Sequence, residues 1–180
     1  MARPGDSNQE ARIEGYLDRA RLTYGTLEDP DFSFTARAFN EQPYRDLVAK
    51  LAEIVKVEDM TDLNDNTCFD YGLIQRRAEW KLKLSMVGPY AMLTRVTRGW
   101  PRRFRILSVE VVEEPTAGTE QAIVELVREA GFTMISAADA EYSVRFAADP
   151  GAEPVDGPLY RVLFSTIPEE VEDLSWRYRY

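Results

Sequence analysis

Apolar and polar residues alternate along the middle of the chain, between Trp80 and Met86. The even-numbered positions of this stretch are apolar, whereas lysine and serine occupy the odd-numbered ones. A period of two predicts a β-strand that buries one face and leaves the other in water. Residues 88–89, Gly-Pro, interrupt the pattern, and a second extended segment follows at 91–97. The pattern therefore predicts a central β-hairpin.

The length of the hairpin loop decides which side chains share a face. A three-residue loop at 88–90 sets Lys83 opposite Arg95, so the cations gather on one face and the apolar groups on the other. A loop with an even number of residues would place Arg95 beside Leu82 on the apolar face, where an unpaired charge is costly. We therefore predict the three-residue loop.

Three other stretches place apolar residues every three or four positions, which is the spacing of amphipathic helices. The first begins with a capping box at Ser7, and Gly25 is suited to end it. Pro43 suits the first turn of the second helix. Thr119 can cap the third helix, and Gly131 can end it. The predicted helices cover residues 7–24, 43–55 and 119–130.

Two further extended segments, at 68–76 and 104–112, flank the hairpin, and this order predicts a four-stranded antiparallel meander. The fold class is therefore α+β, with N-terminal helices and a central helix packed on an antiparallel β-meander sheet. We expect a single domain over residues 1–180, with 1–6 as a flexible tail. For the other segments we expect turns around a short strand at 26–41, turns at 59–66, strands at 132–135, 142–146 and 159–167, a loop at 149–158, an acidic helix at 166–174, and an edge strand or tail at 176–180.

Composition indicates an ordinary globular protein. The chain has 180 residues, of which 44% are hydrophobic and 29% charged, which argues against disorder. No run approaches the ~18 apolar residues of a membrane span, and residues 1–6 lack the apolar core of a signal peptide. A single cysteine excludes an internal disulfide. A soluble, cytoplasmic protein is therefore expected.

Histidine is absent from the chain. This excludes Ser-His-Asp and Cys-His catalysis and the usual zinc and non-haem iron sites. Any catalysis would have to use carboxylates, tyrosine, lysine or arginine. Neither a G-x-G-x-x-G motif nor a P-loop occurs, so we expect no cofactor, no metal and, on balance, no enzyme.

The net charge of −9 conceals a segregation of charge along the sequence. Residues 76–105 contain nine basic side chains and one acid, a balance of +8, whereas the rest of the chain carries −17. The basic block is either an accessible surface for a partner or an internal feature neutralised by acidic helices. The residues expected to bind a partner are Lys81, Lys83, Arg95, Arg98, Trp100, Arg102 and Arg103.

Three weaker candidates have simpler structural explanations. Residues 62–66 resemble the start of a calcium loop, but Thr67 replaces the glycine and Leu73 the glutamate that an EF-hand requires. Cys68 has no histidine to activate it and fits a small core residue. Asp70 and Tyr71 are the first pair to test for carboxylate-based hydrolysis.

The leading functional hypothesis is a non-catalytic cytoplasmic protein-binding module. Its specific form is an acidic immunity or antitoxin-like inhibitor that masks a basic partner. The alternative is binding of a phosphorylated ligand or nucleic acid through the basic sheet face and the Arg/Trp loop. Self-association of the basic face with the acidic surface is also open, and no interaction with a membrane is expected.

Overall fold

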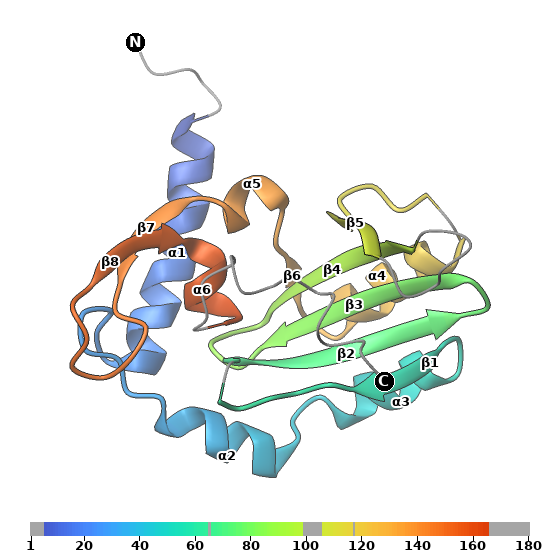
Figure 1. Ribbon diagram of the computed structural model, residues 1–180, viewed down its shortest axis with the longest axis horizontal. Coiled ribbons are helices and arrows are strands. Elements are labelled where there is room, and N and C mark those ends of the chain that lie inside the picture. Colours follow the sequence, from blue (N-terminus) through green and yellow to red (C-terminus); the bar gives the residue numbers. More distant parts are fainter. Residues whose placement is uncertain (1–5, 65, 99–105, 117, 166–180) are drawn as a thin grey trace.

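An antiparallel β-meander forms the centre of the computed structural model, which describes residues 6–64, 66–98, 106–116 and 118–165 (Figure 1). Its five strands follow one another in sequence order, and a short sixth strand runs parallel to the fourth. They are β1 (Lys56–Asp59), β2 (Cys68–Gln75), β3 (Ala78–Ser85), β4 (Tyr90–Arg98), β5 (Ile106–Val111) and β6 (Thr133–Met134). The fold is therefore α+β with a meander sheet, as the sequence predicts.

Helices and a separate hairpin surround this sheet. The helices are α1 (Asp6–Tyr24), α2 (Ser33–Glu41), α3 (Arg45–Ala52), α4 (Gly118–Glu129), α5 (Ala137–Ala140) and α6 (Leu159–Leu163). Strands β7 (Ser143–Phe146) and β8 (Val155–Pro158) form a two-stranded antiparallel hairpin that lies beside α1 and α6 (Figure 1). Within the described residues, no helix has the length and apolar character needed to cross a membrane.

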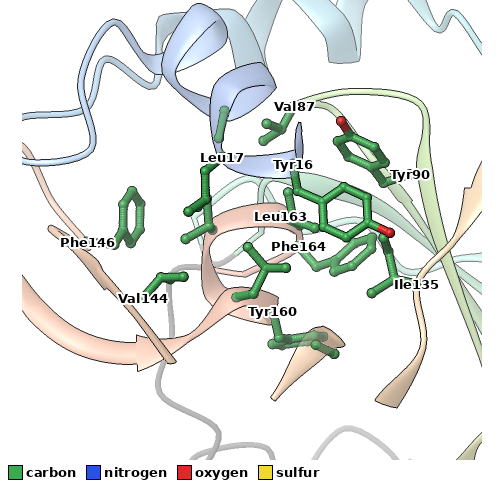
Figure 2. Packing of buried hydrophobic residues seen from close by; sticks show 14 of the residues in the cluster. Tyr16, Leu17, Val87, Tyr90, Ile135, Val144, Phe146, Tyr160, Leu163 and Phe164 are labelled. Carbon is green, nitrogen blue, oxygen red and sulfur yellow. The ribbon is translucent and has the colours of Figure 1, made fainter. Parts of the chain in front are cut away.

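Two apolar cores lie on the two faces of the sheet. The first, here the sheet core, joins α3 and α4 to the face that carries Leu73, Leu82 and Leu93. The second, here the helical core, joins α1, α6 and β7 to the face that carries Cys68 and Met92. Figure 2 shows its side chains converging from these elements. The sheet is therefore covered on both faces, and β3 is buried from its third residue onward.

The pairing of β3 with β4 differs from the predicted register. Leu82 pairs with Leu93 and Trp80 with Arg95, which is the even-loop arrangement. The three-residue loop predicted at 88–90 is wrong. Arg95 lies on the face of the sheet core, and its charge is not left alone there because α4 supplies a carboxylate, that of Glu120.

Glu120, at the start of α4, connects the helix to the sheet through both of its carboxylate oxygens. Its Oε1 accepts hydrogen bonds from Arg95 Nε at 2.6 Å and Trp80 Nε1 at 2.8 Å. Its Oε2 accepts from Arg95 Nη2 at 2.7 Å and from the backbone N–H of Thr116 at 2.9 Å. Glu120 is 1% exposed and the Arg95 side chain 30%, so the carboxylate is withdrawn from solvent and the arginine only partly.

Two predicted helix ends are confirmed by backbone geometry. Gly25 and Gly131 have φ of 83° and 90°, the left-handed conformation that glycine adopts at low cost. The N-terminal details differ, because Asp6 and Gly118 begin their helices and place Ser7 and Thr119 inside them rather than at the caps. Ala130, the last residue of the predicted helix 119–130, is exposed.

Residues 33–41 form α2 rather than turns around a strand. Asp31 stabilises the start of this helix, because its carboxylate accepts hydrogen bonds from both the backbone N–H and the hydroxyl of Ser33. Two aromatic contacts hold it in place: Phe34 packs edge-on against Tyr24, and Phe39 stacks on Phe69. These long-range contacts favour the helical conformation of residues 33–41, whose local sequence pattern is only a weak signal for a helix.

Residues 159–163 form α6 rather than part of the strand predicted at 159–167. Every residue of this segment except Arg161 is buried, and periodicity does not separate a buried strand from a buried helix. The carbonyl groups at the end of α6 find donors elsewhere: Tyr24 Oη donates to Val162 O at 2.8 Å and Ser85 Oγ to Leu163 O at 2.6 Å. These donors satisfy acceptors that a helix end leaves open.

The remaining segments follow the prediction in part. The predicted strands at 132–135 and 142–146 appear as β6 and β7, whereas the predicted loop at 149–158 contains β8. Strand β1 falls outside the four predicted strands of the meander. The acidic helix predicted at 166–174 and the segment at 176–180 lie outside the described residues.

We expect Glu120→Gln to lower the free energy of unfolding by about 3 kcal/mol near pH 7, because it removes the charge that faces Arg95. The hydrogen bonds of Arg95, above all, lower the pKa of Glu120 from 4.5 to about 2. A lowered folded-state pKa stabilises the fold above the unfolded value, and that contribution is lost as the pH falls from about 4.5 toward 2. Urea denaturation at a series of pH values measures the difference between the two proteins.

The matched control for this substitution is Glu125→Gln, on the exposed side of the same helix. It should change the free energy of unfolding by less than ~0.5 kcal/mol. A difference between wild type and Glu120→Gln that stays constant from about pH 7 to about pH 3 would contradict the assigned role of the carboxylate.

Candidate protein-binding surface

The two strand lysines predicted to bind a partner are inside the protein. Lys81 and Lys83 are 3% and 4% exposed, and Asp70, which is fully buried, lies beside them on β2. The Asp70 Oδ2 atom is 3.2 Å from Lys83 Nζ and 3.5 Å from Lys81 Nζ. The expected accessibility of these lysines is wrong, because a carboxylate on the neighbouring strand pairs with both of them.

The aromatic ring of Tyr160, in α6, also lies beside this buried charge cluster. The Nζ atom of Lys83 lies 5.6 Å from the centroid of the Tyr160 ring, within the range of a cation–π interaction. Of the two alternatives for the strand lysines, an accessible surface or an internally neutralised feature, the structure shows the second. It differs from the expectation in its partner, since the acid comes from the sheet and not from a helix.

Among the other predicted partner-binding residues, Arg95 does not join the lysines. Arg95 lies on the opposite face of the sheet, where Glu120 holds it, so the predicted common cationic face does not form. Arg98 is the last residue of β4, and its side chain lies outside the described part of the structure. Trp100, Arg102 and Arg103 also lie outside it, so their role stays a prediction.

Asp70 and Tyr71 do not converge on a common site. Successive residues of a strand point to opposite faces. Asp70 therefore lies with the lysines, whereas Tyr71 packs in the sheet core, where burial raises the pKa of its hydroxyl. Cys68 is fully buried in the helical core, as the small-core-residue interpretation expects.

In the segment predicted to resemble a calcium loop, Asp62 and Asn64 form hydrogen bonds with each other. Asp62 Oδ1 accepts from the backbone N–H of Asn64 at 3.0 Å and from its side-chain amide at 3.1 Å. This is the turn geometry that aspartate favours without any ion. Across the described ranges, no group of three or more acidic or cysteine side chains is arranged to hold a metal.

An acidic corner forms where two loops meet. Its residues come from 28–31 and 149–153, which are more than a hundred positions apart in the sequence. The backbone N–H of Gly151 donates to Asp29 Oδ1 at 3.0 Å, and Ala147 N–H donates to Leu27 O at 2.9 Å. The acidic corner consists of Glu28, Asp29, Asp31, Asp149 and Glu153, all of them exposed.

The acidic corner adjoins a small pocket. The pocket has a volume of about 220 Å³, and Phe32, Asp149 and Pro150 are among its lining residues. It therefore combines an aromatic wall with a carboxylate from the corner. The sequence contains only an indirect signal for this arrangement, namely two Asp-Pro turns far apart, at 29–30 and 149–150.

We expect Asp70→Asn to lower the free energy of unfolding by ~3–5 kcal/mol, because it leaves two buried lysines beside a neutral side chain. Urea denaturation followed by the fluorescence of buried Trp80 measures this loss. Asp59→Asn is the control, since Asp59 is exposed on the adjacent β1 and should tolerate the change within ~0.5 kcal/mol. A loss below ~1 kcal/mol for Asp70→Asn would contradict a structural role of the buried charge.

No family model, curated protein or solved structure matches this chain in the comparisons made. The functional proposal therefore rests on the side chains described above. Among them, the exposed acidic corner and its pocket form the candidate surface for binding another protein.

Proposed function

We propose that this protein is a non-catalytic cytoplasmic binding module that masks a basic protein partner, in the manner of an acidic immunity or antitoxin-like inhibitor. The acidic corner is the observation that carries the proposal. It gathers five exposed carboxylates from two loops that hydrogen bonds hold together. Neither loop segment, 26–31 or 147–156, contains a lysine or arginine that would neutralise it.

The distribution of charge over the surface supports the same partner. Among residues whose exposure is described, exposed acids outnumber exposed bases by about two to one. Several of the basic residues are instead used internally, as Lys81 and Lys83 are. An acidic surface attracts a basic protein before contact and raises the association rate, and salt screens this attraction.

The pocket beside the corner provides a place for one basic side chain of the partner. The aliphatic stem of a lysine or arginine would pack against Phe32, and its charged group would reach Asp149. A pocket of this kind distinguishes a specific partner from any positively charged protein, because it adds shape to charge.

The proposal predicts that Glu28→Lys combined with Glu153→Lys weakens partner binding at least tenfold, because both substitutions reverse charge at the corner. The matched control is Glu125→Lys with Glu129→Lys, which makes the same charge change on the exposed side of α4. Affinity capture from the source cells at about 50 mM and about 500 mM salt first identifies the partner. A titration of that partner against each purified variant then measures its affinity.

A saturable basic partner that binds the wild type and the α4 control alike, and the corner variant weakly, would support the proposal. Equal losses for both variants would mean that only total charge matters, which contradicts a defined surface. Recovery of no protein at the lower salt concentration would also contradict it.

A further inference from the structure

A second and larger pocket lies between α1, α2 and the turn that joins β3 to β4. It has a volume of about 480 Å³, within the range of small-molecule sites. We call it the turn pocket. Its polar lining comes from Arg19, Thr23, Arg37, Glu41 and Tyr44.

The walls of the turn pocket are fixed by specific contacts. Thr23 Oγ1 donates to Val87 O at 2.9 Å and holds the turn against α1. Tyr44 Oη donates to Ser85 O at 2.8 Å and holds the segment after α2 against the end of β3. A side chain at position 88 would meet Arg19 Cγ at 2.9 Å, so glycine there allows the arginine stem to lie over the turn.

Two arginines of the turn pocket are available to a ligand. Arg19 and Arg37 are exposed, and within the described ranges neither has a carboxylate at ion-pair distance. Burial raises the pKa of the Tyr44 hydroxyl, and the positive charge of Arg19, which lines the same pocket, partly opposes this rise. With Glu41 as the single acid, the lining carries +1 in a chain of net charge −9.

Apolar side chains line the pocket beside these charges. Phe34 and Val87 are buried residues of the helical core that also line the turn pocket, together with Met86. The combination of two guanidinium groups with an apolar wall suits a ligand that has an anionic end and an apolar body. Guanidinium groups bind both carboxylate and phosphate oxygens through paired hydrogen bonds.

We propose that the turn pocket binds a small organic anion, with its carboxylate or phosphate between Arg19 and Arg37 and its apolar body against Phe34 and Met86. This inference goes beyond the proposed binding of a protein partner and uses different residues. The acidic corner contributes none of the lining of the turn pocket. The two proposals can therefore fail separately.

The test is a titration followed by the backbone amide NMR signals of Val87 and Gly88, with phenyl phosphate and benzoate as the two anionic probes. We expect saturable shifts at millimolar concentrations for at least one probe, and the probe that binds identifies phosphate or carboxylate as the preferred group. Inorganic phosphate should bind more weakly because it lacks the apolar body, and phenol should bind more weakly because it lacks the charge.

The variants Arg19→Gln and Arg37→Gln should each weaken binding about tenfold, which is the effect of losing one charge-assisted contact. Arg45→Gln is the control, because Arg45 is an exposed arginine of α3 outside the pocket lining. If Arg19→Gln disturbs the turn, Arg37→Gln still tests the role of the arginines. The chemical-shift dispersion of the same spectra shows whether each variant is folded.

Three outcomes would overturn the proposal. The first is the absence of saturable shifts for both probes up to about 20 mM, since a site of this size and charge should bind within that range. The second is an equal loss of affinity in Arg45→Gln, which would indicate non-specific attraction. The third is equal binding of inorganic phosphate and phenyl phosphate, which would exclude a role for the apolar wall.

Discussion

From its third residue onward, strand β3 has no face in contact with water, and this constraint governs the polar chemistry of the protein's interior. Every residue from Trp80 to Ser85 is buried, although the strand alternates apolar and polar side chains. An alternating strand usually buries one face only. Here the second face is also covered, so each polar group on it needs a partner inside the protein.

Two carboxylates meet this requirement, one on each side of the sheet. Asp70 approaches Lys81 and Lys83 on the face of the helical core, whereas Glu120 binds Trp80 and Arg95 on the face of the sheet core. A shift of β3 by one residue would turn its lysines into the sheet core and its leucines toward Asp70. The buried charges therefore oppose alternative registers as well as contributing to stability.

The same arrangement explains why the outside of the described chain is more acidic than its sequence composition suggests. The strand lysines are used internally, so they do not offset the exposed acids. The acidic corner arises where two acidic loops meet, and the turn pocket keeps two arginines without carboxylate partners among the described residues. The surface thus offers separate regions of opposite charge, each with a pocket beside its charged groups.

The sequence by itself determined the features that depend on neighbouring residues. The period of two in β3, the helical spacing of α1, α3 and α4, and the glycines that follow α1 and α4 were all readable, as was the absence of histidine chemistry. The sequence identified the basic strand but misjudged its exposure, and it contained only an indirect signal for the acidic corner, the two distant Asp-Pro pairs. The local pattern distinguishes the two faces of a strand, but it does not show which segments pack against each face.

Only the tertiary structure decided the rest. The register of β3 with β4 depended on Glu120, which lies 25 positions after Arg95 and supplies the charge that pairs with the partly buried arginine. Helices α2 and α6 depended on aromatic contacts and on hydrogen-bond donors from distant segments. The acidic corner and the turn pocket likewise join residues that are far apart in the chain. Each of these features depends on contacts between segments that are distant in the sequence. Such contacts matter energetically because a charge or polar group withdrawn from water is stable only beside a partner, and the fold supplies that partner.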